Sequence, residues 1–313
     1  MPLMWDSLRL GYVQKGLGGQ VATVKPSKHI TAFLEDHFNK LYKKDFEKDG
    51  ASLLWVVKDL RIAERTFFTK EYAYTRFDVD AYISGVDNTF YKIAAIDTIF
   101  VLGGAADATA WHGENIESFF YQLLLKGFDF TKKGIVGVKP KTLSEIVSGY
   151  KKNDQLPILT EHIYTEGVYT DFEEFLQNKP SIISFETELT KEKQLKLWAV
   201  NGEQKTEITG AWGFSKFGEI YKLHELQPIA IQKLGNGFII SDYVEKASMR
   251  NSKLFFASFG GALTGGIVGG VLAGAAVSGN KKNRLLLVSQ YPYLKKRQPE
   301  ATRIDMNTGE FTF

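Results

Sequence analysis

Residues 76–83, Arg76-Phe77-Asp78-Val79-Asp80-Ala81-Tyr82-Ile83, alternate polar and apolar side chains. Successive strand positions point to opposite faces of a sheet, so this alternation predicts a β-strand with one apolar and one polar face. Residues 90–102 form a second apolar stretch, and the turn residues Gly85-Val86-Asp87-Asn88 separate the two. We therefore predict two antiparallel strands joined as a hairpin.

Apolar residues on both sides of the hairpin predict the rest of an N-terminal domain. Residues 53–57 (LLWVV) are rich in residues that favour strands and predict a buried strand that ends at residues 58–61. Two further segments have the apolar spacing of helices, and the second is expected to stop near Gly127. Their apolar positions are Ile30, Phe33, Leu34, Phe38, Leu41 and Tyr42, and then Ile116, Phe119, Phe120, Leu123 and Leu124. The prediction for residues 1–150 is an α+β domain, an antiparallel sheet with helices on one face.

A second domain is predicted from residue 151 to 313, because lysines, glycines and Pro140 interrupt the pattern before it. Thr170 and Glu173 have the spacing of a capping box and predict a short helix. After this helix the period becomes two, and residues 285–288 and 307–309 are expected to resume it after an apolar insertion at 254–279. The candidate strands are 182–188, 195–200, 206–212, 219–223, 229–233 and 238–243. This domain is predicted to be a mainly antiparallel β roll or barrel.

The overall composition fits an ordinary protein of two globular domains. The chain has 313 residues, of which 44% are hydrophobic and 24% charged, so neither general disorder nor a polytopic membrane protein is indicated. The net charge is +3, and the scattered lysines and arginines give no nucleic-acid signature. The chain has no cysteine, which removes disulfides, thiolate nucleophiles and cysteine-ligated zinc. The first twenty residues do not read as a secretion signal, so either the protein is not exported or its signal has been removed.

No motif in the sequence points to a cofactor, a metal or an enzyme class. No P-loop, nucleophile elbow or dinucleotide fingerprint is present. The five histidines lack zinc-protease spacing, and we interpret them as surface or cap residues. His112-Gly113-Glu114 matches half of a zinc deaminase motif, but the other half requires cysteines.

Charged residues on the predicted strands are the one candidate for polar chemistry. They could meet across neighbouring strands, where carboxylates with arginines can do acid–base work or bind a polar ligand. Cross-strand salt bridges explain the same charges more simply. A hydrolase would require Asp78, Asp80 and His112 to converge in a cleft. The charged set is Asp59, Arg61 and Glu64 with Arg76, Asp78 and Asp80.

The stretch LFFASFGGALTGGIVGGVLAGAAVSG, residues 254–279, has no charged residue. As a helix it would be about 39 Å long, enough to cross a hydrocarbon core of about 30 Å with some tilt. Small residues recur every four positions in two adjacent rows, which let helices approach closely within lipid. One row is Gly261, Gly265, Gly269 and Ala273, and the other is Ala262, Gly266, Gly270, Gly274 and Ser278. We take Gly261, Gly265, Gly266, Gly269, Gly270 and Gly274 as the membrane or oligomerisation site.

Three arrangements of residues 254–279 remain open. A single crossing would put residue 285 and all that follows on the opposite side of the membrane from Ile239 and would split the second domain. A re-entrant hairpin bent near Gly265-Gly266 or Gly269-Gly270 returns the chain to the same side, although each arm is then too short to span. Alternatively, the segment packs as a helical pair on its own domain.

Residues 166–182 (EGVYTDFEEFLQNKPSI), with Ala211-Trp212-Gly213-Phe214 and Gly218-Glu219-Ile220-Tyr221, resemble a group of uncharacterised Bacteroidota envelope proteins. The likeness covers roughly residues 160–290. Members of this group are commonly exported and often carry a glycine-rich apolar stretch late in the chain. The resemblance therefore implies that this protein is exported. It brings no catalytic residues, and Gly167, Pro180, Trp212 and Gly213 are read as fold determinants.

Together these observations predict a non-enzymatic protein of the bacterial cell envelope. It would associate with a membrane, or with like chains, through the glycine zipper at 254–279, and act as an interaction or assembly component with an envelope protein partner. The alternative is a soluble periplasmic small-molecule binding protein in which the glycine segment packs on its own core.

Overall fold

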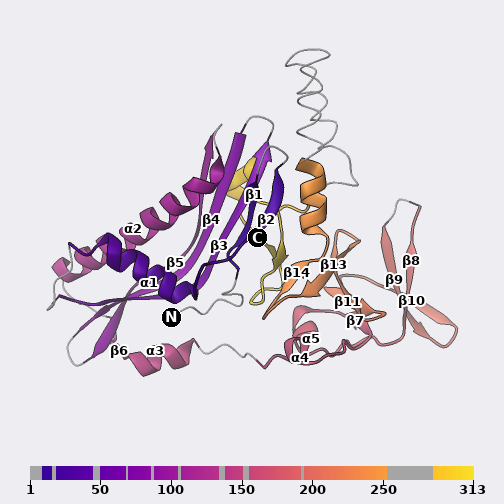
Figure 1. Cartoon of the computed structure of the whole chain (residues 1–313). Helices are drawn as coiled ribbons and strands as arrows, with labels where there is room; N and C mark the ends of the chain where they lie inside the picture. Colours follow the sequence, from indigo (N-terminus) through magenta and orange to yellow (C-terminus); the bar gives the residue numbers. More distant parts are fainter. Residues whose placement is uncertain are drawn as a thin grey trace, which may run out of the picture. The chain divides into compact units, whose positions relative to one another are not determined.

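The computed structural model describes residues 9–15, 19–44, 50–67, 70–85, 88–104, 107–133, 138–150, 155–191, 194–251 and 285–313. Its elements have the predicted α+β class (Figure 1). The chain divides into two compact units. Unit 1 comprises Met1–Lys152, Val244–Glu300 and Phe313, and unit 2 comprises Asn153–Tyr243 and Ala301–Thr312.

Unit 1 is built on a six-stranded sheet of order β2-β1-β3-β4-β5-β6. Its strands are β1 (Gly11–Lys15), β2 (Gln20–Val24), β3 (Leu53–Phe67), β4 (Lys70–Ser84), β5 (Thr89–Gly104) and β6 (Lys141–Thr142). Every neighbouring pair is antiparallel except β1 and β3. The expectation of a wholly antiparallel sheet was therefore wrong at this pair. Between β1 and β3 the chain runs through β2 and α1 (Ile30–Leu41), and a connection of that length permits parallel pairing.

The predicted hairpin of residues 76–83 and 90–102 is confirmed as part of β4 and β5, which are longer than predicted. Strand β3 does not end at residues 58–61 and continues to Phe67. Its pairing with β4 shifts between Val57 and Asp59, so Lys58 is the extra residue of a β-bulge. The bulge keeps both Val57 and Leu60 in the apolar core on one face.

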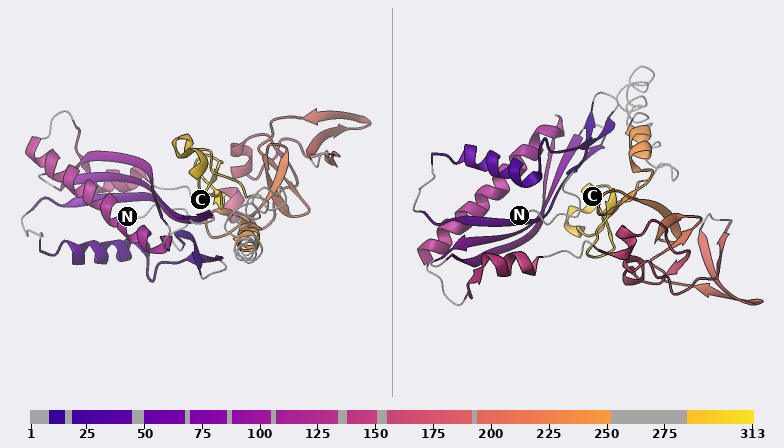
Figure 2. Two further views of the ribbon diagram at one scale, coloured as in Figure 1. Left: turned by 90° about the horizontal axis from the view of Figure 1, so that it is seen from above. Right: turned by 60° about the horizontal axis from the view of Figure 1, so that its bottom comes forward.

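Helices α1 and α2 (Trp111–Lys133) cover one face of this sheet (Figures 1 and 2). Their apolar residues meet the strands in an aromatic core, in which the rings of Phe77 and Phe119 stack with centroids 4.0 Å apart. The predicted end of α2 near Gly127 was wrong. A Cβ atom at Gly127 would come within 2.9 Å of Leu53 in β3, so this glycine lets the helix pass close to the sheet.

Shorter elements complete unit 1. They are η1 (Ala108–Ala110), α3 (Leu143–Gly149), η3 (Pro292–Arg297) and, from Val244 onward, a helix over residues 243–251. A capping box of Thr142 and Glu145 begins α3. Within the residues that the structure describes, no helix combines the length and the apolar character needed to cross a bilayer.

Unit 2 contains two antiparallel sheets, of order β10-β9-β8 and β16-β15-β14-β13-β12-β11-β7. The first consists of β8 (Phe185–Leu189), β9 (Leu195–Asn201) and β10 (Gln204–Ile208). The second consists of β7 (Gly167–Tyr169), β11 (Gly213–Lys216), β12 (Glu219–His224), β13 (Gln227–Lys233), β14 (Phe238–Ile240), β15 (Arg303–Ile304) and β16 (Phe311–Thr312). Residues 285–288 and 307–309 were expected to resume the strand pattern. The 307–309 turn lies between the paired strands β15 and β16 of this sheet, whereas Leu287 bridges to Glu300 in unit 1.

Helices α4 (Pro157–Thr160) and α5 (Phe172–Leu176) belong to unit 2. The predicted capping box is displaced by one residue, because Asp171 is the N-cap and accepts a hydrogen bond from the Glu174 amide. Phe175 of α5 is fully buried and stacks on Trp212 with centroids 4.3 Å apart. This aromatic contact fixes α5 to the larger sheet.

Candidate functional site

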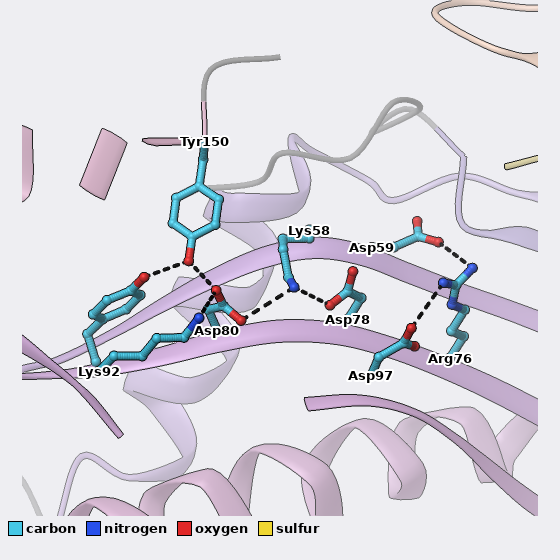
Figure 3. Close-up of polar contacts among 9 residues, drawn as sticks. Lys58, Asp59, Arg76, Asp78, Asp80, Lys92, Asp97 and Tyr150 are labelled. Atoms are coloured by element: carbon cyan, nitrogen blue, oxygen red, sulfur yellow. Dashed lines mark hydrogen bonds and ion pairs between the residues drawn. The ribbon is translucent and has the colours of Figure 1, made fainter. Parts of the chain in front are cut away.

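Charged side chains of β3, β4 and β5 gather on the sheet face that α1 and α2 do not cover (Figure 3). Phe77, Val79 and Ala81 point into the helix-covered core, so the alternating residues Asp78 and Asp80 point to the other face. We call this the charged face, and it has two clusters. The first consists of Lys58, Asp78, Asp80, Tyr82, Lys92 and Tyr150, and the second of Asp59, Arg61, Arg76 and Asp97.

Lysine side chains neutralise both aspartates of the first cluster. The Nζ atom of Lys58 lies 2.5 Å from Oδ1 of Asp78 and 3.4 Å from Oδ1 of Asp80. Lys92 Nζ lies 2.6 Å from the other oxygen of Asp80. The β-bulge at Lys58 makes this possible, since it turns both Lys58 and Asp59 toward the charged face.

Two tyrosines connect the end of α3 to Asp80. The Tyr150 hydroxyl donates to the Asp80 carboxylate, and the Tyr82 and Tyr150 hydroxyl oxygens are 2.5 Å apart. Burial raises the pKa of Tyr150, and the carboxylate beside it raises it further, so the hydroxyl stays protonated as a donor. Burial also acts to raise the pKa of Asp80, but the hydrogen bonds from Lys92 and Tyr150 outweigh it, and this pKa is lowered. The pKa of Asp78 is instead raised, because burial outweighs the hydrogen bond and the positive charge of Lys58.

The second cluster pairs arginines with aspartates. Arg61 Nε lies 3.0 Å from Asp59 Oδ1, and Arg76 approaches Asp59 at 3.6 Å and Asp97 at 3.5 Å. The structure thus brings together five of the six charged residues singled out in the sequence. Each carboxylate of the two clusters has a lysine or arginine partner, so ion pairing across strands accounts for these charges.

Glu64 and His112 lie instead on the helix-covered face. His112 Nε2 is 3.3 Å from Glu64 Oε1, and its Nδ1 is 3.2 Å from the hydroxyl of Thr75. The interpretation of His112 as a surface or cap residue was wrong, because it is 5% exposed at the start of α2. The convergence of Asp78, Asp80 and His112 that a hydrolase would need does not occur, since the sheet separates them.

A second group of buried charges connects the segments that precede and follow the apolar stretch. Arg250, in the helix that precedes the stretch, donates to the Glu300 carboxylate, and Arg65 Nε of β3 lies 3.3 Å from the same oxygen. Glu300 is 2% exposed, and its backbone pairs with Leu287, which follows the stretch. We call Arg65, Arg250 and Glu300 the flank clamp. It links residues before and after the stretch through one carboxylate.

Hydrogen bonds to the β1–β2 hairpin hold the same helix on unit 1. The side-chain amide of Asn251 donates to the Gly19 carbonyl at 2.8 Å, and Ser248 Oγ accepts from the backbone N–H of Val21 at 3.2 Å. On the other side, the Val288 amide donates to the Pro299 carbonyl at 3.0 Å. Both flanks of the stretch therefore belong to unit 1. The zipper residues predicted as the site, Gly261, Gly265, Gly266, Gly269, Gly270 and Gly274, lie outside the described residues.

Unit 2 contains a buried lysine that the sequence did not single out. Lys222 of β12 is 5% exposed, and its Nζ lies 4.7 Å from the ring centroid of Trp212 and 5.3 Å from that of Phe311. Among the described residues no carboxylate pairs with it. Burial lowers the pKa of its ammonium group, and the negative charge of Glu310 opposes this. The aromatic rings supply the attraction that an acidic partner would normally provide.

Replacing Lys222 with methionine is expected to stabilise unit 2, by on the order of 1 kcal/mol at neutral pH, because the desolvation penalty disappears. Since the pKa of Lys222 in the folded protein lies below its ordinary value of 10.5, the unfolded chain binds more protons between the two values. Wild-type stability should therefore rise with pH across that interval, and Lys222→Met should lack this rise. Urea unfolding followed at several pH values tests both statements. Lys222→Arg, which keeps the charge, should show no stabilisation.

The residues that carry the resemblance are structural in unit 2. Gly167 has a φ of +155°, and a Cβ atom there would meet the Pro180 ring at 2.6 Å. A Cβ atom at Gly213 would meet the Tyr221 carbonyl oxygen at 2.4 Å. The Trp212 indole N–H donates to the Gly309 carbonyl at 3.1 Å. These contacts support the interpretation of the two glycines, Pro180 and Trp212 as fold determinants.

Comparison of the chain with protein-family models, with curated proteins and with solved structures finds no match. Among the described residues, no three histidine, aspartate or glutamate side chains are grouped so that they could hold a metal ion.

Proposed function

We propose that this protein is a non-enzymatic component of the bacterial cell envelope that attaches to a membrane, or assembles with like chains, through residues 254–279. The proposal includes a glycine-zipper helical insertion in that stretch and a β roll or barrel for the domain around it. An envelope protein is the expected partner, and the domains are expected on the periplasmic side if a signal peptide has been removed.

The observation that carries the proposal is the position of the flank clamp. A stretch of 26 uncharged residues begins a few residues after Arg250 and ends a few residues before Leu287. Arg250 and Leu287 both contact Glu300, and all three belong to unit 1. Breaking a buried ion pair of this kind costs about 3–5 kcal/mol, so the two flanks are expected to stay together.

Because both flanks of residues 254–279 lie on unit 1, a re-entrant hairpin is favoured over a single crossing. A single crossing would carry residue 285 through the membrane and separate Leu287 and Glu300 from Arg250. A re-entrant hairpin satisfies the clamp, and two arms of about 13 residues would each reach roughly 20 Å into the bilayer. We therefore propose that residues 254–279 enter the membrane and return to the same side. The small-residue rows then pack the two arms together, or pack them against those of a second chain.

Carbonate extraction and detergent-phase partitioning test the attachment, with the full chain beside a variant in which a short Gly-Ser linker replaces residues 254–279. The full chain should remain with membranes, whereas the deletion variant should be soluble and folded, because the clamp and the sheet of unit 1 are left intact. If both proteins are soluble and the deletion variant unfolds, the stretch belongs to the protein's own core. The soluble small-molecule binding protein then becomes the better hypothesis.

A matched variant separates anchoring from assembly. Gly265→Leu with Gly269→Leu retains the apolar character but removes small residues from one row of the zipper. Membrane extraction should be unchanged, while chemical cross-linking between chains should decrease if the zipper joins two copies.

A further inference from the structure

Helix α2 carries a line of exposed apolar residues on the side away from the sheet. Tyr121, Leu125 and Phe128 follow the i, i+4, i+7 spacing of one helix face and are 49%, 43% and 51% exposed. Their neighbours Phe119, Phe120 and Leu123 fill the core on the opposite side. The line is therefore not part of the core that holds α2 on the sheet.

The end of α1 extends this apolar surface. His37 Nε2 is 3.1 Å from Glu117 Oε1, and the Tyr42 ring stacks on Tyr121 with centroids 6.5 Å apart. The two helices therefore run in the same direction along the sheet. Leu41, at the end of α1, is 45% exposed.

Lysines surround these residues. Residues 40–44 and 121–133 contain six lysines, and Asp129 is the one acidic residue in these two ranges. Lys40, Lys43, Lys44 and Lys132 are all exposed, and Lys132 continues the line of Phe128 by one turn. We call Leu41, Tyr121, Leu125 and Phe128 with these four lysines the basic aromatic patch.

We propose that the basic aromatic patch docks on an anionic lipid surface, with α2 lying in the plane of the interface. Aromatic rings and leucines enter the boundary between headgroups and acyl chains, and lysines around them attract anionic headgroups. A second copy of the chain is disfavoured as the occupant, because a symmetric contact would bring the lysines of both patches together. The inference extends the proposed membrane association but uses none of residues 254–279.

The cysteine-free sequence allows a direct test on the full chain. Leu125→Cys is labelled with the environment-sensitive dye NBD and mixed with vesicles of phosphatidylcholine alone or with added phosphatidylglycerol. Ser148→Cys, an exposed position of α3, is the matched control, because α3 packs through Ile146 on Tyr82 and therefore lies on the opposite face of the sheet from α2. Dye at 125 should shift to the blue and brighten with phosphatidylglycerol vesicles, and dye at 148 should change much less. Changing each of the four lysines to glutamine should lower vesicle affinity about five-fold per residue.

Three outcomes would overturn the proposal. They are no spectral change at 125, an equal change at 148, or a change at 125 that depends on protein concentration without vesicles, which would identify a second copy as the occupant. A label at Val271→Cys separates this inference from the proposed function. A shift at 271 without one at 125 contradicts the patch and supports insertion of 254–279, whereas a shift at 125 alone supports the patch and contradicts insertion.

Discussion

Glu300→Ala is expected to lower the free energy of unfolding of unit 1 by about 3–5 kcal/mol. The Glu300 carboxylate accepts from Arg250 and pairs with Arg65, and the side chains of all three are less than one-fifth exposed. Removing it leaves two guanidinium groups buried without this carboxylate, and Arg65 retains the Gln298 carbonyl as an acceptor at 2.6 Å. Urea unfolding with hydrogen exchange read by mass spectrometry measures the loss in unit 1 separately from unit 2.

Asp36→Ala provides the matched comparison in the same unit. Asp36 pairs with Lys28, but their side chains are 66% and 44% exposed, so its removal should cost less than about 1 kcal/mol. A further variant with Arg250→Met and Glu300→Leu should recover part of the loss, because it removes both members of a buried pair. If Glu300→Ala costs no more than Asp36→Ala, the clamp does not hold the flanks.

The same Glu300→Ala variant probes the proposed topology. Amide exchange should accelerate in residues 243–251 and 285–299, which the clamp connects, and should stay unchanged in residues 155–191 of unit 2. Acceleration on one side of the stretch alone would mean that the flanks are held independently. The clamp would then no longer favour a re-entrant arrangement of residues 254–279.

The parts of the fold that the sequence predicted are those with a local periodic signal. The β4–β5 hairpin follows from alternation in residues 76–83, and α1 follows from apolar residues at helical spacing. The same alternation explains why Asp78 and Asp80 share a face. Lys58 could not be assigned to that face, because a β-bulge has no clear local signal and here decides where the side chain points.

The errors arose where tertiary contacts outweigh local preference. The charges of residues 58–61 suggested a strand end, but Asp59 and Arg61 are paired on the sheet and the strand continues. Gly127 suggested a helix end, but its missing side chain allows close packing on Leu53. The parallel pairing of β1 with β3 and the Arg250–Glu300 contact join residues about 50 positions apart, for which one sequence gives no periodic signal.

Phe119→Ala is expected to destabilise unit 1 by about 3–5 kcal/mol. The Phe119 ring is 2% exposed, stacks on Phe77 and makes an edge contact with Phe100 at 5.9 Å. Truncation would leave a cavity between α2 and two long strands, which cannot collapse easily because their neighbours are paired on both sides. Chemical unfolding with hydrogen exchange across residues 111–133 measures the effect.

Leu125→Ser on the outer side of the same helix supplies the contrast. Leu125 is 43% exposed and outside the core, so its replacement should change stability by less than about 0.5 kcal/mol. The two variants should have the opposite effects on binding to anionic vesicles. Leu125→Ser should weaken this binding, whereas Phe119→Ala should leave it unchanged under conditions where unit 1 is still folded. If Leu125→Ser instead destabilises unit 1 as strongly as Phe119→Ala, the outer face of α2 has a structural role within the chain. Opposite rankings in the two measurements would assign the inner face of α2 to folding and its outer face to membrane contact.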